Sequence, residues 1–128
     1  MRLLLDSHVL VWWLAGDEAV SPDARAAIGD PANEVFVSAA SSWQIATKHR
    51  LGQMPQAAFL TGDAAAVIAD QGFTELPISL RHAQIAGSLP PLHPDPFLRA
   101  LVAQAIVSDL VVVSDQPAFD TYGVTRMW

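Results

Sequence analysis

The sequence predicts a single α/β domain, built on a central parallel sheet of about five strands with helices on both faces. Three observations support this prediction. Apolar, strand-like runs recur along the chain, and most of the segments between them have helical patterns. Strands that alternate with helices in this way form parallel βαβ units. The length of 128 residues suits one domain over 1–128, and no internal repeat or linker divides it.

Five runs are expected to form the strands of this sheet. They lie at residues 2–6, 34–38, 73–78, 110–114 and 124–128. Four helix starts carry capping residues. Ser21-Pro22 offers an N-cap and an N1 proline, Ser41 can cap a helix over 42–51 that stops at Gly52, Ser79 can cap 80–88, and Asp95-Pro96 opens 96–107. The proline-dense stretch at 90–96 forms a stiff approach to the last of these helices.

The composition of the chain argues against several classes of function. The net charge of −6 gives no basic footprint of the kind that drives nucleic-acid binding, although an acidic site can still reach phosphate through Mg²⁺. The absence of cysteine excludes disulfides, thiolate zinc sites and cysteine nucleophiles. No apolar run approaches the length of a membrane span, and the first residues lack the features of a secretion signal. A cytoplasmic protein without membrane association is therefore expected.

Two aspartates follow apolar runs that are expected to be buried strands. Asp6 ends the first run and Asp115 follows the run at 110–114. In an open parallel sheet, ligands and metal ions bind at the carboxyl ends of the strands, so the two carboxylates predict a shared metal site. Each has a structural alternative. Asp6 suits the N-cap of the next helix, and Asp115 lies in a favourable Ser-Asp-Gln-Pro turn.

Seven stretches of the sequence also resemble a known family. They are Leu4–Leu14, Val37–Lys48, Leu51-Gly52, His93–Phe97, Leu101–Ala105, Val113–Asp115 and Phe119–Val124. In order, and over essentially the whole chain, they are similar to VapC-type toxins of the PIN-domain family. The resemblance implies a PIN-like α/β domain and a Mg²⁺- or Mn²⁺-dependent endoribonuclease, a hydrolase of RNA. It also implies a cognate antitoxin as protein partner, RNA as substrate, and a homodimer.

The family's catalytic set is four acidic residues, of which this sequence keeps a part. By the resemblance, Asp6 takes the first position and Asp115 the last. Gln44 stands where the family has a glutamate, and Leu98 stands where it has an aspartate. Gln44 keeps a carbonyl oxygen without the charge, so it is a degenerate catalytic position. Its distance from Ser41 is also the spacing of a capping box, which is the favoured reading.

Asp95 offers a replacement for one lost charge. It lies three residues before Leu98, and side chains at this spacing are neighbours at the start of a helix. The expected catalytic and metal-binding set is therefore Asp6, Asp115 and Asp95, although capping the helix that Pro96 begins is the favoured role of Asp95.

Other polar residues could assist such a site. Ser38 and Ser114 could hydrogen-bond a metal-bound water, and Lys48 or Arg99 could contact a phosphate.

Two functions follow from these residues. The first is a VapC-like ribonuclease toxin in which bound Mg²⁺ or Mn²⁺ activates water and stabilises charge on phosphate. The alternative is a catalytically inactive PIN-fold protein that binds an antitoxin or RNA without cleaving it.

Overall fold

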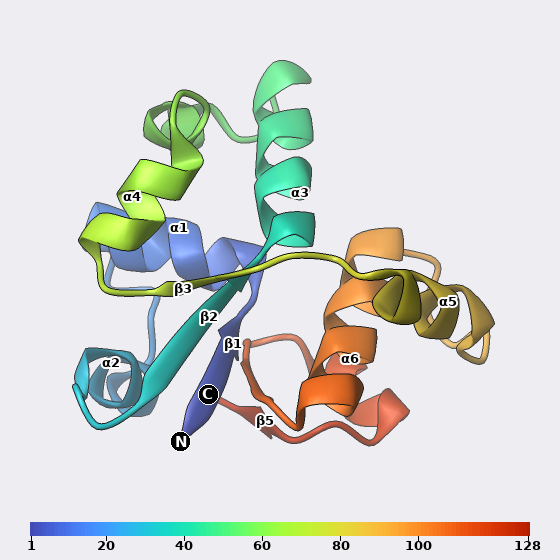
Figure 1. Cartoon of the computed structure of the whole chain (residues 1–128). Helices are drawn as coiled ribbons and strands as arrows, with labels where there is room; N and C mark the ends of the chain where they lie inside the picture. Colours follow the sequence, from blue (N-terminus) through green and yellow to red (C-terminus); the bar gives the residue numbers. More distant parts are fainter.

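The computed structural model describes all residues from 1 to 128 and contains one five-stranded sheet in which every pairing is parallel. The strand order is β3-β2-β1-β4-β5 (Figure 1). The strands are β1 (Arg2–Leu5), β2 (Glu34–Ser38), β3 (Thr74–Leu76), β4 (Val111–Val113) and β5 (Arg126–Met127). The expected α/β fold with a parallel sheet is confirmed, and every strand except β2 is shorter than predicted.

Helices cover both faces of the sheet, as expected for parallel strands (Figure 1). The α-helices are α1 (Ser7–Ala15), α2 (Pro22–Gly29), α3 (Ala39–Arg50), α4 (Ala64–Asp70), α5 (Leu80–Ser88) and α6 (Pro96–Ser108). Two short 3-10 helices, η1 (Pro55–Leu60) and η2 (Pro117–Tyr122), complete the chain. No helix combines the length and the hydropathy that crossing a membrane requires.

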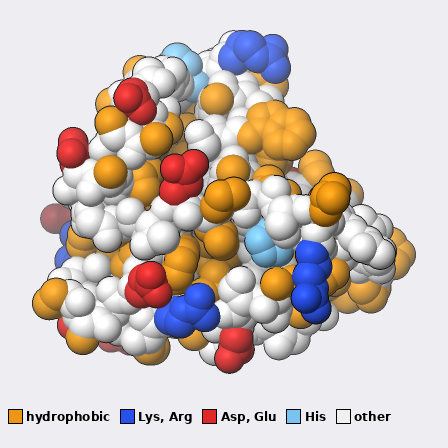
Figure 2. Space-filling model, in the orientation of Figure 1, with side chains coloured by type: hydrophobic (Ala, Val, Ile, Leu, Met, Phe, Trp, Pro, Cys, Tyr) orange, Lys and Arg blue, Asp and Glu red, His pale blue; other side chains and the backbone are white.

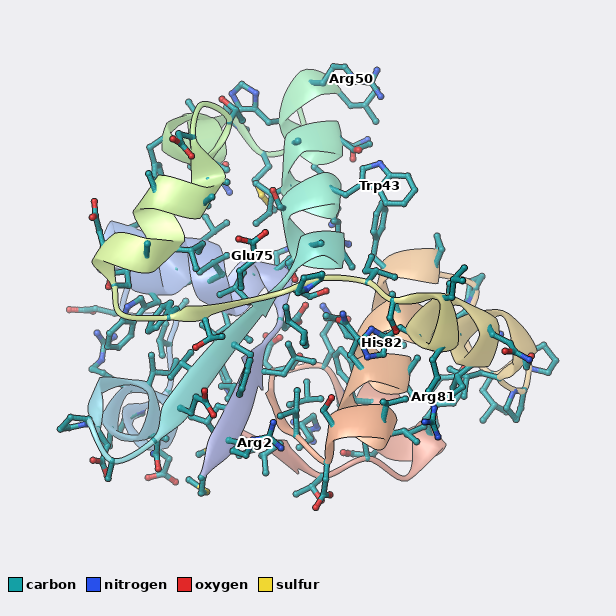
Figure 3. The ribbon with its side chains drawn as sticks, viewed as in Figure 1. Arg2, Trp43, Arg50, Glu75, Arg81 and His82 are labelled. Atoms are coloured by element: carbon teal, nitrogen blue, oxygen red, sulfur yellow. The ribbon has the colours of Figure 1, made fainter.

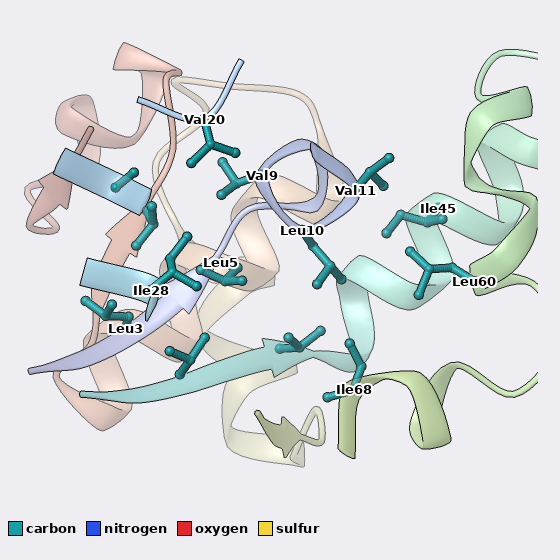
Figure 4. Packing of buried hydrophobic residues seen from close by; sticks show 14 of the residues in the cluster. Leu3, Leu5, Val9, Leu10, Val11, Val20, Ile28, Ile45, Leu60 and Ile68 are labelled. Carbon is teal, nitrogen blue, oxygen red and sulfur yellow. The ribbon is translucent and has the colours of Figure 1, made fainter. Parts of the chain in front are cut away.

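The central strand β1 explains why the core has two halves. Successive side chains of a strand point to opposite faces, so Leu3 and Leu5 enter one half and Leu4 enters the other. The first core cluster consists of Leu3, Leu5, Val9, Leu10, Val11, Val20, Ala24, Ala27, Ile28, Val35, Val37, Ile45, Met54, Ala57, Leu60, Ile68 and Val113 (Figure 4). The second core cluster consists of Leu4, Phe36, Leu98, Leu101, Val102, Ala105, Leu110, Val112 and Phe119.

Three of the four expected helix caps are confirmed. The Ser21 side chain accepts from the Ala24 amide, Ser79 forms a capping box with His82, and Asp95 accepts from the Phe97 amide. The fourth was wrong. Helix α3 begins at Ala39, because the Ser38 hydroxyl accepts from the Ala40 amide at 3.0 Å where β2 ends.

Ser41 therefore lies inside α3 and not before it. Its side chain is buried, and its hydroxyl oxygen has no hydrogen-bond partner. The predicted capping box between Ser41 and Gln44 is consequently absent, and the side chain of Gln44 is free to reach another element.

Candidate functional site

Asp6 is the centre of the polar cluster at the carboxyl edge of the sheet. It lies between β1 and α1, is 4% exposed, and is the N-cap of α1. Its Oδ1 accepts from the Ser7 amide at 2.7 Å. Its Oδ2 accepts from the Ser114 hydroxyl at 2.8 Å and from Nε2 of Gln116 at 3.3 Å. Both carboxylate oxygens are thus engaged by donors of the protein itself.

The burial of Asp6 favours the neutral form of its carboxyl group. Burial raises the pKa of Asp6 above its ordinary value, because a charged carboxylate loses its hydration inside the protein. The hydrogen bond from Ser114, the charge of His8 and the Ser7 amide act in the opposite direction. The negative charge of Asp115 adds to the rise, since two carboxylates repel.

The loop after β4 brings the side chain of Gln116 within hydrogen-bond distance of Asp6. Ser114 ends the strand, and its hydroxyl oxygen accepts from the Gln116 amide at 3.0 Å. This local turn, a common one for serine, aims the Gln116 side chain back at Asp6. The Asp115 side chain between them is exposed, and its charge acts on Asp6. Sequence reasoning missed Gln116, although the serine two residues before it is a recognisable turn signal.

Gln44 is the second amide of the cluster. It is 7% exposed on α3, and its Oε1 accepts from the Ser7 hydroxyl at 2.5 Å. Because Ser7 is the first residue of α1, this bond joins the start of α1 to α3. The neutral oxygen at this degenerate position is therefore used to connect two helices.

Asp95 and Leu98 have structural roles at the start of α6. Asp95 is half-buried and caps its helix through the Phe97 amide at 2.9 Å, and its own amide donates to Nδ1 of His93 at 3.2 Å. Leu98 is 4% exposed and belongs to the second core cluster. No three His, Cys, Asp or Glu side chains anywhere in the structure could hold a metal ion together. Asp95 consequently does not join Asp6 and Asp115 in such a group.

Three other polar residues were predicted to assist the site, namely Arg99, Ser38 and Lys48. Arg99 donates to the carbonyl oxygens of Leu89 at 2.7 Å, Pro90 at 3.0 Å and Ala86 at 3.1 Å. These carbonyls take up most of the donors of Arg99, and its contact with a phosphate stays a prediction. Ser38 is 1% exposed and caps α3. Lys48 is half-buried on α3, and its contact with a phosphate stays a prediction.

The donor set around Asp6 does not fit a resident divalent cation. Mg²⁺ prefers charged oxygen ligands in a nearly octahedral arrangement. Here the buried carboxylate of Asp6 already accepts three hydrogen bonds, and the Gln116 amide presents its nitrogen to it. The carboxylate of Asp115, whose charge acts on Asp6, is exposed. Gln44 is neutral and its oxygen is bonded to Ser7.

An open groove of about 410 Å³ lies between α3 and α4, over the carboxyl ends of β2 and β3. Its lining residues are Val37, Ser38, Ala39, Ser42, Trp43, Ala46, Ala64, Ala65, Ile68 and Glu75. Trp43 is 65% exposed and meets the Phe97 ring edge-on, with ring centroids 5.3 Å apart. Glu75 is the single charged residue of the lining (Figure 3). Figure 2, in the same orientation, shows apolar side chains gathered on this face of the molecule.

Comparisons with known proteins place the fold. No protein-family model matches the chain. No curated protein matches it in sequence. Fourteen chains of solved structures match it, and two of these matches extend over nearly the full length of both chains.

The first is VapBC2 from Rickettsia felis bound to a DNA fragment from their promoter, with a TM-score of 0.70 and 9% identity over 100% of this chain and 99% of that one. The second is FitAcB from Neisseria gonorrhoeae, with a TM-score of 0.64 and 15% identity over 98% of this chain and 96% of that one. At these identities the likeness shows the fold alone, and the expected PIN-like α/β fold is confirmed.

Proposed function

We propose that this chain is a VapC-like PIN-fold protein that binds an antitoxin-type partner and does not cleave RNA. The observation that carries the proposal is the hydrogen bonding of Asp6, whose two oxygens accept from Ser7, Ser114 and Gln116. A carboxylate satisfied in this way stabilises its own surroundings and has little capacity left for a hard cation. The full-length fold match to a chain of the VapBC2 structure supports the toxin-like character.

The groove between α3 and α4 is the surface best suited to a protein partner. Its walls are mostly small and apolar, and Trp43 provides a large exposed ring at one side. Aromatic side chains of this kind are frequent anchors of protein interfaces. Glu75 would favour a partner segment that carries a basic side chain among apolar ones, because it is the only charge in the lining.

A cleavage assay tests the catalytic half of the proposal. Purified protein and its Asp6→Asn variant are incubated at high concentration with single-stranded RNA and folded RNA, in Mg²⁺ and in Mn²⁺. We expect the two proteins to be equally inactive. Cleavage by the unmodified protein that disappears in Asp6→Asn would show that Asp6 serves a nuclease.

A binding measurement tests the partner half. The chain is co-expressed with the product of a small open reading frame beside its own gene, and the affinity of the purified pair is measured by calorimetry. Trp43→Ala should weaken the pair by about 2 kcal/mol, as expected for a buried aromatic anchor. Leu80→Ala is the matched control, since Leu80 is 91% exposed and lies outside the groove lining. Equal affinities for both variants would show that the partner does not bind in the groove.

The metal-dependent endoribonuclease is the second candidate, and two observations favour it. The strands before Asp6 and Asp115 are parallel neighbours, with Leu5 beside Val113. The charge of Asp115 also adds to the rise in the pKa of Asp6. RNA as substrate and a homodimer are predictions that rest on the family resemblance. Asp95 as an assisting acid rests on its spacing from Leu98, and a cytoplasmic location rests on the sequence composition.

A further inference from the structure

We propose that the amides of Gln44 and Gln116 keep the Asp6 edge free of divalent cations, and that replacing both by glutamate creates a cation site there. This inference rests on the proposed non-cleaving function and deepens it, because it assigns the loss of a metal centre to particular side chains. It concerns the binding of the cation alone and involves neither RNA nor a partner.

The first step is the position of the two amides around one short segment. Asp6 is bonded to Gln116 in the loop after β4, and its neighbour Ser7 is bonded to Gln44 on α3. Residues 6 and 7 therefore hold the two glutamines on either side of the junction between β1 and α1. Asp6, Ser7 and Gln44 are all buried, so the contacts are made within the protein and largely away from solvent.

The second step is the orientation of the Gln116 amide. Its Nε2 lies 3.3 Å from Oδ2 of Asp6, so the positive end of the amide dipole already faces the carboxylate. Ser114 donates to the same oxygen. These neutral donors supply the interaction that a cation would otherwise supply, and they do so without the cost of removing water from an ion.

The third step is the chemistry of the replacement. Glutamate has the same length as glutamine, but it has two acceptor oxygens in place of one acceptor and one donor. In Gln116→Glu an oxygen would replace the nitrogen beside Asp6, and two carboxylates this close repel each other. A divalent cation between them removes the repulsion. Gln44→Glu adds a further carboxylate on the other side of the same segment.

The experiment is a calorimetric titration of the folded proteins with Mn²⁺ alone. Four proteins are compared: the unmodified chain, Asp6→Asn, Gln44→Glu/Gln116→Glu, and Gln53→Glu/Gln56→Glu. The last is the matched control, because it adds the same charge at two exposed glutamines outside the cluster. We expect the Gln44→Glu/Gln116→Glu variant to bind Mn²⁺ at least about tenfold more tightly than the unmodified chain, with the control unchanged. Mn²⁺ should also raise its melting temperature.

Two results would overturn the inference. The first is Mn²⁺ binding by the unmodified chain that Asp6→Asn abolishes. The second is a folded Gln44→Glu/Gln116→Glu variant that binds Mn²⁺ no more tightly than the control. Circular dichroism establishes folding, and if the double variant does not fold, Gln116→Glu alone is judged by the same comparison. These titrations are independent of partner binding. If the chain failed to bind an antitoxin, the proposed function would be contradicted, but the inference about the cation site would not.

Discussion

Gln116 donates a hydrogen bond from its side-chain Nε2 to Oδ2 of Asp6 across 3.3 Å, although 110 positions of sequence separate the two residues. The bond closes the loop after β4 onto the start of α1. Together with the hydroxyl of Ser114, it surrounds the buried carboxylate with neutral donors. We therefore expect Asp6 to contribute to the stability of the fold through these hydrogen bonds.

Asp6→Asn should lower the free energy of unfolding at neutral pH, but by less than Asp6→Ala does. Asparagine caps a helix as well as aspartate does and removes the cost of burying a charge, but its single oxygen cannot accept at both positions that the carboxylate serves. Asp6→Ala is the control. It should lose about 1–2 kcal/mol, because the Ser7 amide and the Ser114 hydroxyl lose their acceptor. Urea unfolding measures both variants, and equal losses in the two would contradict the prediction.

The pH dependence of this difference has a defined sign. The pKa of Asp6 is raised in the folded protein from its ordinary value of 3.8, chiefly by burial. Between that value and the raised one, the folded state binds more protons than the unfolded state, so this group lowers stability as pH rises. The stability of Asp6→Asn relative to the unmodified chain should therefore rise from acid to neutral pH. A relative stability that falls over this range would show that the pKa of Asp6 is lowered.

Leu98→Asp should destabilise the protein and should not rebuild an acidic site. Leu98 is 4% exposed within the second core cluster, where it packs with Leu101 and Phe119. We expect a loss of about 4 kcal/mol or more, from the vacated apolar volume and the buried charge. Leu98→Met keeps the volume and should cost less than about 1.5 kcal/mol. A folded Leu98→Asp variant of ordinary stability would place this side chain at the edge and not in the core.

Arg99→Ala should loosen the segment between α5 and α6. The guanidinium group of Arg99 bonds three backbone carbonyls at residues 86, 89 and 90, and it also contacts the Tyr122 hydroxyl at 3.2 Å. We expect a loss of about 2 kcal/mol, the usual scale for hydrogen bonds to a charged group. Arg99→Lys should recover only part of it, since an ammonium group cannot bond all of these oxygens in the same geometry. Amide hydrogen exchange over 86–95 should accelerate in Arg99→Ala, and unchanged exchange would contradict the role.

Asp120 should titrate below its ordinary range. Arg126 donates to both oxygens of Asp120 at 2.9 Å, and this hydrogen bonding lowers the pKa of Asp120 from 3.8. The pair contributes stability above the ordinary pKa that is lost as pH falls through the lowered one. Carboxyl NMR titration measures the pKa directly, and Arg126→Gln should return it to the ordinary range. A pKa of Asp120 that stays low in Arg126→Gln would show that Arg126 does not cause the shift.

Much of the fold was predictable because local signals agree with the parallel sheet. The run at 2–6 is buried on both faces and ends in Asp6, which lies at the carboxyl edge as expected. The caps at Ser21, Ser79 and Asp95 were predictable for the same reason, since each depends on its own few neighbours.

The contacts within the site were less predictable because they depend on long-range geometry. Ser41 and Gln44 have capping-box spacing, but α3 begins at Ala39, so Gln44 turns to Ser7 on another helix. Asp115 has the residue type of a metal ligand, whereas the turn at Ser114 directs the next side chain, Gln116, to Asp6. Residue type alone did not distinguish these neighbours.

A crystal structure of the unmodified chain soaked in Mn²⁺, with anomalous diffraction data, tests the central claim most directly. We expect no anomalous peak at the carboxyl edge, and we expect Asp6 to remain within hydrogen-bond distance of the Ser114 hydroxyl and the Gln116 amide. An anomalous peak coordinated by Asp6 and Asp115, with Gln116 displaced from Asp6, would contradict it.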